Sequence, residues 1–359
     1  MTDVYAFPQL LGVYRNLLRI EMGSDANTGD GTLIFGTDAM AFGVVAHRGD
    51  NTDPFGALAL PAQAYAGALL GGARSYPILS GIGSLPAPAN IVDLMLALNM
   101  GDAAALGFRL GIANAGSSTT PDGGDSTGVS QTSINFGAGY SMLGEGLKMD
   151  LGLNLNIGLG SDSTAGVDNE TTGSDIHVGV NARFYLPMQE QVDLAILGGI
   201  DLNFGGISTP GGDSSVFGLN IGAGVGPVYK LEHARLAAYA FLAFATRSTD
   251  PNTDADGDDS STTSLTIPGV HMAMEVDLNE WLQFRAGLEY AWMINGQSDA
   301  NNNSQSENTG SFGWSGGFGL IFDQFRVDIS VNNAWFTSGP DFLGGDGELA
   351  ANIAGTYHF

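Results

Sequence analysis

The chain has 359 residues, a formal net charge of −26 and a sequence pI near 4.1, and it contains no cysteine. Such an acidic composition argues against nucleic acid as a partner, because nucleic-acid binding requires clustered basic side chains. Without cysteine the chain has no disulfide framework and no thiolate metal site. The sequence also gives no reason to expect a cofactor.

Most of the chain alternates apolar residues with small or polar ones, which is the two-residue period of a β-strand. Between 147 and 159 every odd position is large and apolar, whereas the even positions include Lys148, Asp150, Gly152 and Asn154. One face of such a strand suits lipid and the other suits an aqueous interior or small neighbours. Because the pattern repeats almost to the end of the chain, it predicts an all-β fold, a transmembrane antiparallel β-barrel.

Taken in chain order, the alternating segments predict about sixteen strands, an even number as in single-chain bacterial barrels. They cover residues 13–22, 31–36, 39–48, 91–100, 104–114, 131–143, 147–160, 174–187, 192–204, 215–229, 234–247, 264–278, 281–294, 310–322, 325–336 and 349–359. Short connections alternate with long ones, which fall at 49–90, 115–130, 161–173, 205–214, 248–263, 295–309 and 337–348. Short turns are expected in the periplasm and long loops outside, so both termini should be periplasmic. Residues 1–359 are thus predicted to form one barrel domain.

Aromatic residues gather near the ends of the predicted strands. They are placed to form the girdles that barrels carry at the two membrane interfaces, although strand propensity alone is an alternative explanation. The residues concerned are Tyr140, Tyr229, Tyr290, Trp292, Trp335 and Tyr357.

Residues 1–7 lack the basic region and following apolar run of a signal peptide. A protein of the outer membrane needs such a peptide for export, so we interpret the sequence as the mature chain. A cytosolic protein is the alternative interpretation.

The last predicted strand ends in Phe359, and Tyr357, Ile353 and Ala351 precede it at alternate positions. This ending resembles the C-terminal strand of bacterial outer-membrane barrels, a family in which the barrel assembly machinery recognises it; Gly355 departs from the pattern. Taken together, this C-terminal strand and the strand pattern make the chain resemble a porin-like protein of a Gram-negative outer membrane. No specific porin family is identified. The resemblance implies contact with outer-membrane lipid, recognition by the assembly machinery and a homo-oligomer, commonly a trimer.

Charged side chains are expected on the lumen face of the barrel, where they form a charged wall. Asp150, Arg183 and Asp193 should lie low on three successive strands, and Asp277 should face Arg285 across a periplasmic turn. The wall can act as a field that orients and selects solutes, or as cross-strand ion pairs that stiffen the barrel. Alternation of the signs favours ion pairs. The wall comprises Arg109, Lys148, Asp150, Arg183, Asp193, Arg235, Asp277, Arg285, Glu289, Arg326 and Asp328.

The long loop 49–90 is more apolar than the other loops. A large apolar surface normally marks a contact, so the loop is expected either to enter the lumen as a constriction or to latch onto a neighbouring barrel. Constriction is favoured. The side chains concerned include Leu58, Leu60, Tyr65, Leu69, Leu70, Arg74 and Tyr76.

One acidic loop resembles the start of a calcium-binding loop. Asn252, Asp254 and Asp256 alternate before Gly257, but Thr263 stands where the bidentate glutamate is expected. These residues are a weak calcium candidate, and a solvated loop is the simpler interpretation. No set of serine, histidine and acid side chains can be assigned to one place, so the sequence predicts no enzyme.

Three functions are compatible with this pattern. The first is a channel for passive diffusion of small hydrophilic solutes, constricted by 49–90, since sixteen strands are wide enough for an aqueous lumen. The second is a non-conducting structural or interaction barrel of the outer-membrane surface. The third is a carrier for apolar substrates.

Overall fold

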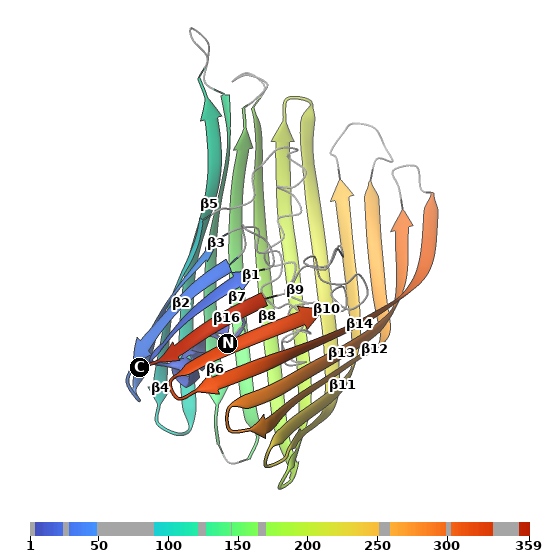
Figure 1. Cartoon of the computed structure of the whole chain (residues 1–359). Coiled ribbons are helices and arrows are strands. Elements are labelled where there is room, and N and C mark those ends of the chain that lie inside the picture. Colours follow the sequence, from blue (N-terminus) through green and yellow to red (C-terminus); the bar gives the residue numbers. More distant parts are fainter. Residues whose placement is uncertain are drawn as a thin grey trace, which may run out of the picture.

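The computed structural model describes residues 4–23, 29–48, 90–120, 127–144, 146–163, 170–250, 259–298, 303–332 and 352–359. Within these residues sixteen strands form one closed barrel in which β1 pairs with β16 (Figure 1). Every pairing is antiparallel. All pairs except β1 with β16 join strands that are consecutive in the chain. The predicted fold class and the number of strands are confirmed.

The strands run as a continuous meander around the wall. Their bounds are β1 Leu17–Gly23, β2 Gly29–Gly36, β3 Met40–Arg48, β4 Asn90–Met100, β5 Ala104–Thr119, β6 Thr127–Met142, β7 Lys148–Asp162, β8 Thr171–Gln189, β9 Val192–Thr209, β10 Gly212–Lys230, β11 Ala234–Asp250, β12 Ser260–Asn279, β13 Leu282–Ser298, β14 Ser304–Phe322, β15 Phe325–Asn332 and β16 Asn352–His358. One further element, the 3-10 helix η2 (Pro8–Tyr14), precedes β1.

Several boundary predictions were wrong: β5, for example, ends at Thr119 rather than at residue 114, and β14 begins at Ser304 rather than at residue 310. The first strand begins at Leu17 rather than at residue 13, because Pro8–Tyr14 form helix η2 instead. The predicted long loop at 205–214 is mostly strand, since β9 reaches Thr209 and β10 starts at Gly212. There the small and polar residues after Phe204 carry no alternation, yet the two strands remain hydrogen-bonded along the whole stretch.

The alternation correctly separates the two faces of the wall. On β7 the odd residue Leu153 is 49% exposed and Leu159 is 53% exposed, whereas the even residues Asn154 and Asn156 are buried. Among the aromatic residues expected in the girdles, Tyr229, Tyr290, Trp292 and Tyr357 are exposed, and Trp335 lies outside the described residues. The exposed apolar face is therefore the outer face of the barrel.

In the part of the chain that the structure describes, no helix is long and apolar enough to cross a membrane.

Candidate functional site

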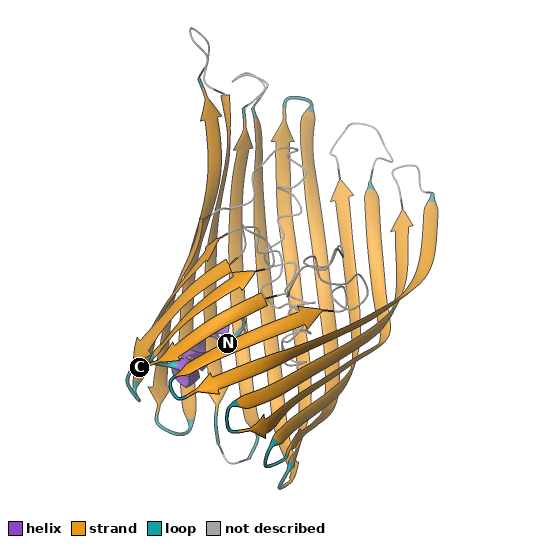
Figure 2. Cartoon of the chain, in the orientation of Figure 1, coloured by secondary structure: helices purple, strands orange, loops and turns teal. Residues whose placement is uncertain are grey.

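The N-terminal segment, residues 4–14, lies inside the barrel. Helix η2 contacts strands β2 to β6 and is drawn behind the short strands of the wall in Figure 2. Val4, Phe7, Gln9 and Leu11 in the segment are all at most 3% exposed. The lumen is consequently occupied, over part of its cross-section, by the chain that leads into β1.

Small residues of the wall make room for this segment. Ala97, Gly107, Gly139 and Gly152 are direct register partners on β4, β5, β6 and β7, so they form one row across the lumen face. A Cβ atom added to Gly107 would lie 1.9 Å from the backbone nitrogen of Gln9. Cβ atoms on Gly139 and Gly152 would meet Gln9 Oε1 at 1.7 Å and the carbonyl oxygen of Ala6 at 2.1 Å. Only glycine permits this close approach of the segment.

Apolar contacts hold the segment against the wall. Its residues Val4, Tyr5 and Leu11 form one buried cluster with lumen-facing residues of β1 to β4. Those wall residues are Leu17, Ile34, Ala41, Val45, Met95 and Ala97. A fully buried aliphatic or aromatic side chain contributes roughly 1.5–3 kcal/mol, so the whole cluster stabilises the bound segment substantially.

Two lumen arginines cover aromatic side chains of the segment. The guanidinium carbon of Arg183 lies 4.5 Å from the ring centre of Phe7 and 5.9 Å from that of Tyr185. Arg109 lies 5.6 Å from the ring centre of Tyr5. Such cation–π contacts add to the apolar burial and link the segment to β5 and β8.

A second apolar cluster, here called the aromatic cluster, lies on the lumen face of β8 to β11. Its buried members include Leu197, Tyr239 and Phe241, and Tyr185 and Val228 pack against them. The ring of Phe241 also stacks on His271 of β12, with 5.0 Å between ring centres. The lumen thus presents apolar side chains on two parts of its wall.

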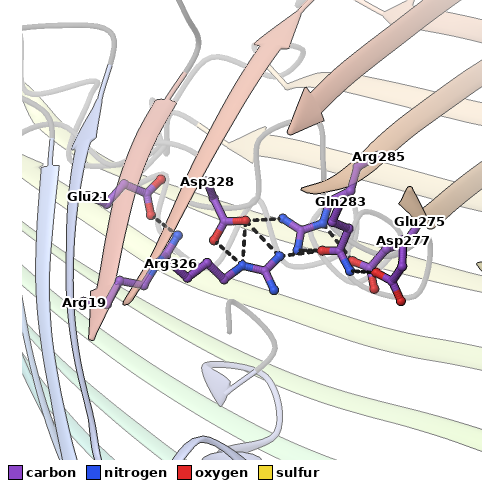
Figure 3. Close-up of polar contacts among 8 residues, drawn as sticks. All are labelled: Arg19, Glu21, Glu275, Asp277, Gln283, Arg285, Arg326 and Asp328. Atoms are coloured by element: carbon purple, nitrogen blue, oxygen red, sulfur yellow. Dashed lines mark hydrogen bonds and ion pairs between the residues drawn. The ribbon is translucent and has the colours of Figure 1, made fainter. Parts of the chain in front are cut away.

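The charged wall on β12 to β15 is a connected network (Figure 3). Arg285 donates to Glu275 at 2.8 Å, to Asp328 at 2.7 Å and to Gln283 at 2.6 Å. Arg326 donates to Asp328 at 2.9 Å and to Gln283 at 2.6 Å. The opposite charges neutralise one another within the wall, which agrees with the interpretation of cross-strand ion pairs.

One predicted contact of this wall, between Asp277 and Arg285, was wrong by one pairing position. Arg285 faces Glu275 in the register and bonds to it, whereas Asp277 faces Gln283 and accepts its hydrogen bond at 2.7 Å. Asp150 and Arg183 do pair, with 2.5 Å between Oδ2 and Nε. Asp193 lies near the start of β9, toward the same end of the barrel as predicted, and forms its ion pair with Lys230. Lys230 sits at the end of β10, where the turn to β11 begins, and the sequence analysis treated it as part of that turn.

The remaining predicted wall residues do not meet at one point. Arg109 lies 3.9 Å from Asp93, and Glu289 lies 3.7 Å from His271. Lys148 and Arg235 are exposed, each near the first residue of its strand. The wall therefore has separate groups of charges, and its role in selecting solutes stays a prediction.

Loss of the central arginine of the β12–β15 network should destabilise the barrel. Arg285→Met leaves Glu275 without its guanidinium partner, whereas Asp328 keeps its contact with Arg326, and an unpaired group of this kind costs roughly 1–3 kcal/mol. The side chain is partly exposed, which favours the lower half of that range. The free energy of unfolding in urea, measured in lipid vesicles, tests this. Lys148→Met is the control, because this exposed side chain should be replaceable without measurable loss.

Several predicted sites fall outside the described residues. These are the apolar side chains of 49–89 and the calcium candidate at Asn252, Asp254 and Asp256, so both stay predictions. The C-terminal residues are described, and Tyr357 and Phe359 are exposed. Their recognition by the assembly machinery also stays a prediction.

The sequence analysis did not identify the N-terminal segment. Its signal was present, because residues 4–14 are mostly apolar but do not alternate, unlike the strands that follow. An apolar stretch without alternation, placed before the first strand of a barrel, cannot join the wall. It must be buried elsewhere, and the lumen is the nearest place.

An antiparallel barrel closed by an even number of strands, apolar outside and polar over much of its lumen, defines a β-barrel protein of the Gram-negative outer membrane.

No protein-family model matches the chain, and no curated protein matches it in sequence. Among solved structures, the chain is similar to the alcaligin outer-membrane receptor FauA of Bordetella pertussis, with a TM-score of 0.46, 10% identity and coverage of 88% of this chain and 60% of the receptor. The iron transporter FrpB of Neisseria meningitidis gives a TM-score of 0.45 at 10% identity, covering 90% and 62%. The toluene transporter TodX of P. putida gives 0.42 at 10% identity, covering 99% and 94%. The chain thus spans about three fifths of the first two proteins.

Proposed function

We propose that this protein carries small molecules with an apolar part across the outer membrane, through a lumen that the N-terminal segment partly occupies. The observation that carries the proposal is the burial of residues 4–14 inside the barrel, against the row of small residues on β4 to β7. The segment narrows the aqueous path through the lumen, which a carrier requires.

The apolar side chains of the lumen support the same proposal. Leu197, Tyr239 and Phe241 form the aromatic cluster on the lumen face, apart from the cluster around the N-terminal segment. Ligand sites in proteins are mostly lined by apolar and aromatic side chains with a few polar groups. These side chains are at most 7% exposed, so a passing molecule with an apolar part contacts them only by displacing their present neighbours.

Uptake of an apolar dye tests the proposal. N-phenyl-1-naphthylamine is excluded by an intact outer membrane and fluoresces once it enters. Gram-negative cells that produce the full chain should take up the dye faster than cells that produce the doubly substituted barrel, Tyr239→Asp with Phe241→Asp. The two barrels are compared at equal abundance. The purified protein should also show only small or rare conductance steps in a planar bilayer.

The opposite result supports the channel for hydrophilic solutes. Large, stable conductance steps from the unmodified protein, together with dye uptake no faster than in the doubly substituted barrel, would contradict the carrier. The N-terminal segment would then be the constriction of a diffusion pore. Heat-modifiable migration on gels checks that the unmodified barrel and the doubly substituted barrel are both folded, so that a difference in dye uptake is not caused by misfolding.

A further inference from the structure

An exposed carboxylate projects into the lumen from the middle of β13. The side chain of Glu289 is 48% exposed, and its Oε1 lies 3.7 Å from Nε2 of His271 on β12. Among the described residues, no lysine or arginine pairs with Glu289, whereas the carboxylate of Glu275 on the same wall pairs with Arg285 at 2.8 Å. Glu289 therefore presents a negative charge that the described wall does not neutralise.

The imidazole beside this carboxylate has an unsatisfied nitrogen. His271 is 6% exposed, and its Nε2 has no hydrogen-bond partner among the described residues. The 3.7 Å between Nε2 and Glu289 Oε1 is too long for a direct hydrogen bond. Buried polar atoms are nearly always satisfied in folded proteins, so this geometry leaves a place for a further polar group that contacts both atoms.

Two neighbouring strands leave space in front of Glu289. The register places Gly313 of β14 directly beside it, and Gly287 and Ala291 are the next lumen-facing residues of β13 on either side. A Cβ atom added to Gly313 would meet no atom of the described chain within 4 Å. The lumen beside the exposed carboxylate is therefore open, unlike the row of glycines under the N-terminal segment.

An aromatic ring fixes the orientation of the imidazole. Phe241 of β11 stacks on His271, with 5.0 Å between ring centres and 28° between ring planes. The stack limits rotation of the imidazole, so its Nε2 stays on the side of Glu289. The two polar groups are consequently held at a fixed spacing before any molecule arrives, which lowers the entropic cost of binding.

An ammonium group matches this pair of atoms. It has three N–H donors, so one can bond to the carboxylate and another to Nε2 of a neutral imidazole whose proton is on Nδ1. It also supplies the positive charge that Glu289 lacks, which a water molecule or a hydroxyl group does not. The net charge of −26 acts in the same direction, since a strongly acidic protein raises the local concentration of cations and disfavours anions.

We propose that Glu289 and His271 bind the ammonium group of a small amine, and that the open space beside Gly313 receives the part of the molecule next to that group. The inference rests on the proposed function, because it names the polar end of the molecules that the carrier moves.

Calorimetric titration of the purified full chain with two matched probes tests the site, after subtraction of the heat from protein-free micelles. Hexylamine carries the ammonium group, and 1-hexanol has the same alkyl chain without the charge. We expect the amine to bind about tenfold more tightly than the alcohol, a difference of roughly 1.4 kcal/mol. Glu289→Gln keeps the size of the side chain but removes its charge, so the preference should fall to about twofold or less while alcohol binding stays unchanged. His271→Phe keeps a ring against Phe241 but removes Nε2, and it should weaken amine binding by about 2- to 10-fold.

Glu307→Gln is the matched control. Glu307 is an exposed residue on the same face of β14 as Gly313, six residues further along the strand, so loss of its charge should leave the preference for the amine intact. Equal binding of the two probes to the unmodified protein, or binding of neither, overturns the inference. Equal losses of amine binding in Glu289→Gln and Glu307→Gln overturn it by showing a general effect of charge. These results leave the carrier standing, whereas failure of the dye experiment with the amine preference intact contradicts the carrier and leaves the binding site in place.

Discussion

Gly107→Leu is expected to detach the N-terminal segment from the barrel wall. The leucine Cβ alone would lie 1.9 Å from the backbone nitrogen of Gln9 and 2.3 Å from the carbonyl carbon of Pro8. These are backbone atoms, so no side-chain rotation relieves the overlap. Overpacking of this kind costs roughly 1–3 kcal/mol, and moving the segment is easier than moving a hydrogen-bonded strand.

Labelling of a single introduced cysteine measures the detachment. The chain has no cysteine of its own, so Leu11→Cys provides one thiol, at a position that is 0% exposed. A water-soluble maleimide reacts only when the segment leaves the wall. At a cost of roughly 1–3 kcal/mol, the detached fraction and the labelling rate should rise by about 5- to 150-fold. Conductance in a planar bilayer should rise as the detached fraction of the segment rises.

Gly313→Leu is the matched control for this experiment. Gly313 also lies on a strand of the barrel wall, on β14, and a Cβ added there meets no atom within 4 Å. The same substitution should therefore leave labelling of Leu11→Cys slow. If Gly107→Leu and Gly313→Leu gave the same slow labelling and the same conductance, the segment would not depend on the glycine row.

The wall of this barrel follows from local sequence, and that explains why it could be predicted. Each strand buries or exposes its residues with a period of two, so Leu153 and Asn154 are assigned to opposite faces without any knowledge of their neighbours. The meander requires only that successive strands pair, and the pairing of β1 with β16 then closes the barrel. The even number of strands and the short turns then agree with the observed structure.

Cross-strand partners depend on details that the alternation does not contain. Asp277 was expected opposite Arg285, but the register places Glu275 there, and it shifts between Asp277 and Asn279 next to the turn. A change of two positions keeps every side chain on the same face, so the hydrophobic pattern cannot detect it. Turn geometry sets this register, and the residues 279–281 do not specify it.

The contents of the lumen were the least predictable part. The glycine row of Gly107, Gly139 and Gly152 comes from three strands, and it is continuous only after the register is known. A lumen constriction was expected from loop 49–90, whose residues 49–89 lie outside the described part of the chain. The segment that the structure places in the lumen is residues 4–14, which reach β5 to β7 across long separations in sequence.

Leu153→Arg should destabilise the barrel by placing a charged side chain on its outer face. Leu153 lies near the middle of β7 on the outer face and is 49% exposed, so an arginine there contacts the hydrocarbon of the membrane. Arginine on the lipid face near the midplane of a barrel costs about 2–4 kcal/mol. Its lumen-facing neighbour Asn154 is buried and is unsuitable as the position for a control.

Unfolding in urea from lipid vesicles gives the free energies needed, with Gly313→Arg as the comparison. The space beside Gly313 accommodates a longer side chain, and a charged group in the lumen stays hydrated, so the cost should remain within roughly 0.5 kcal/mol. A much larger loss of unfolding free energy in Leu153→Arg than in Gly313→Arg would show that β7 presents its odd residues to lipid. Equal losses would mean that the apolar face of β7 does not contact hydrocarbon, and the assignment of a membrane-spanning barrel would then fail at its strongest strand.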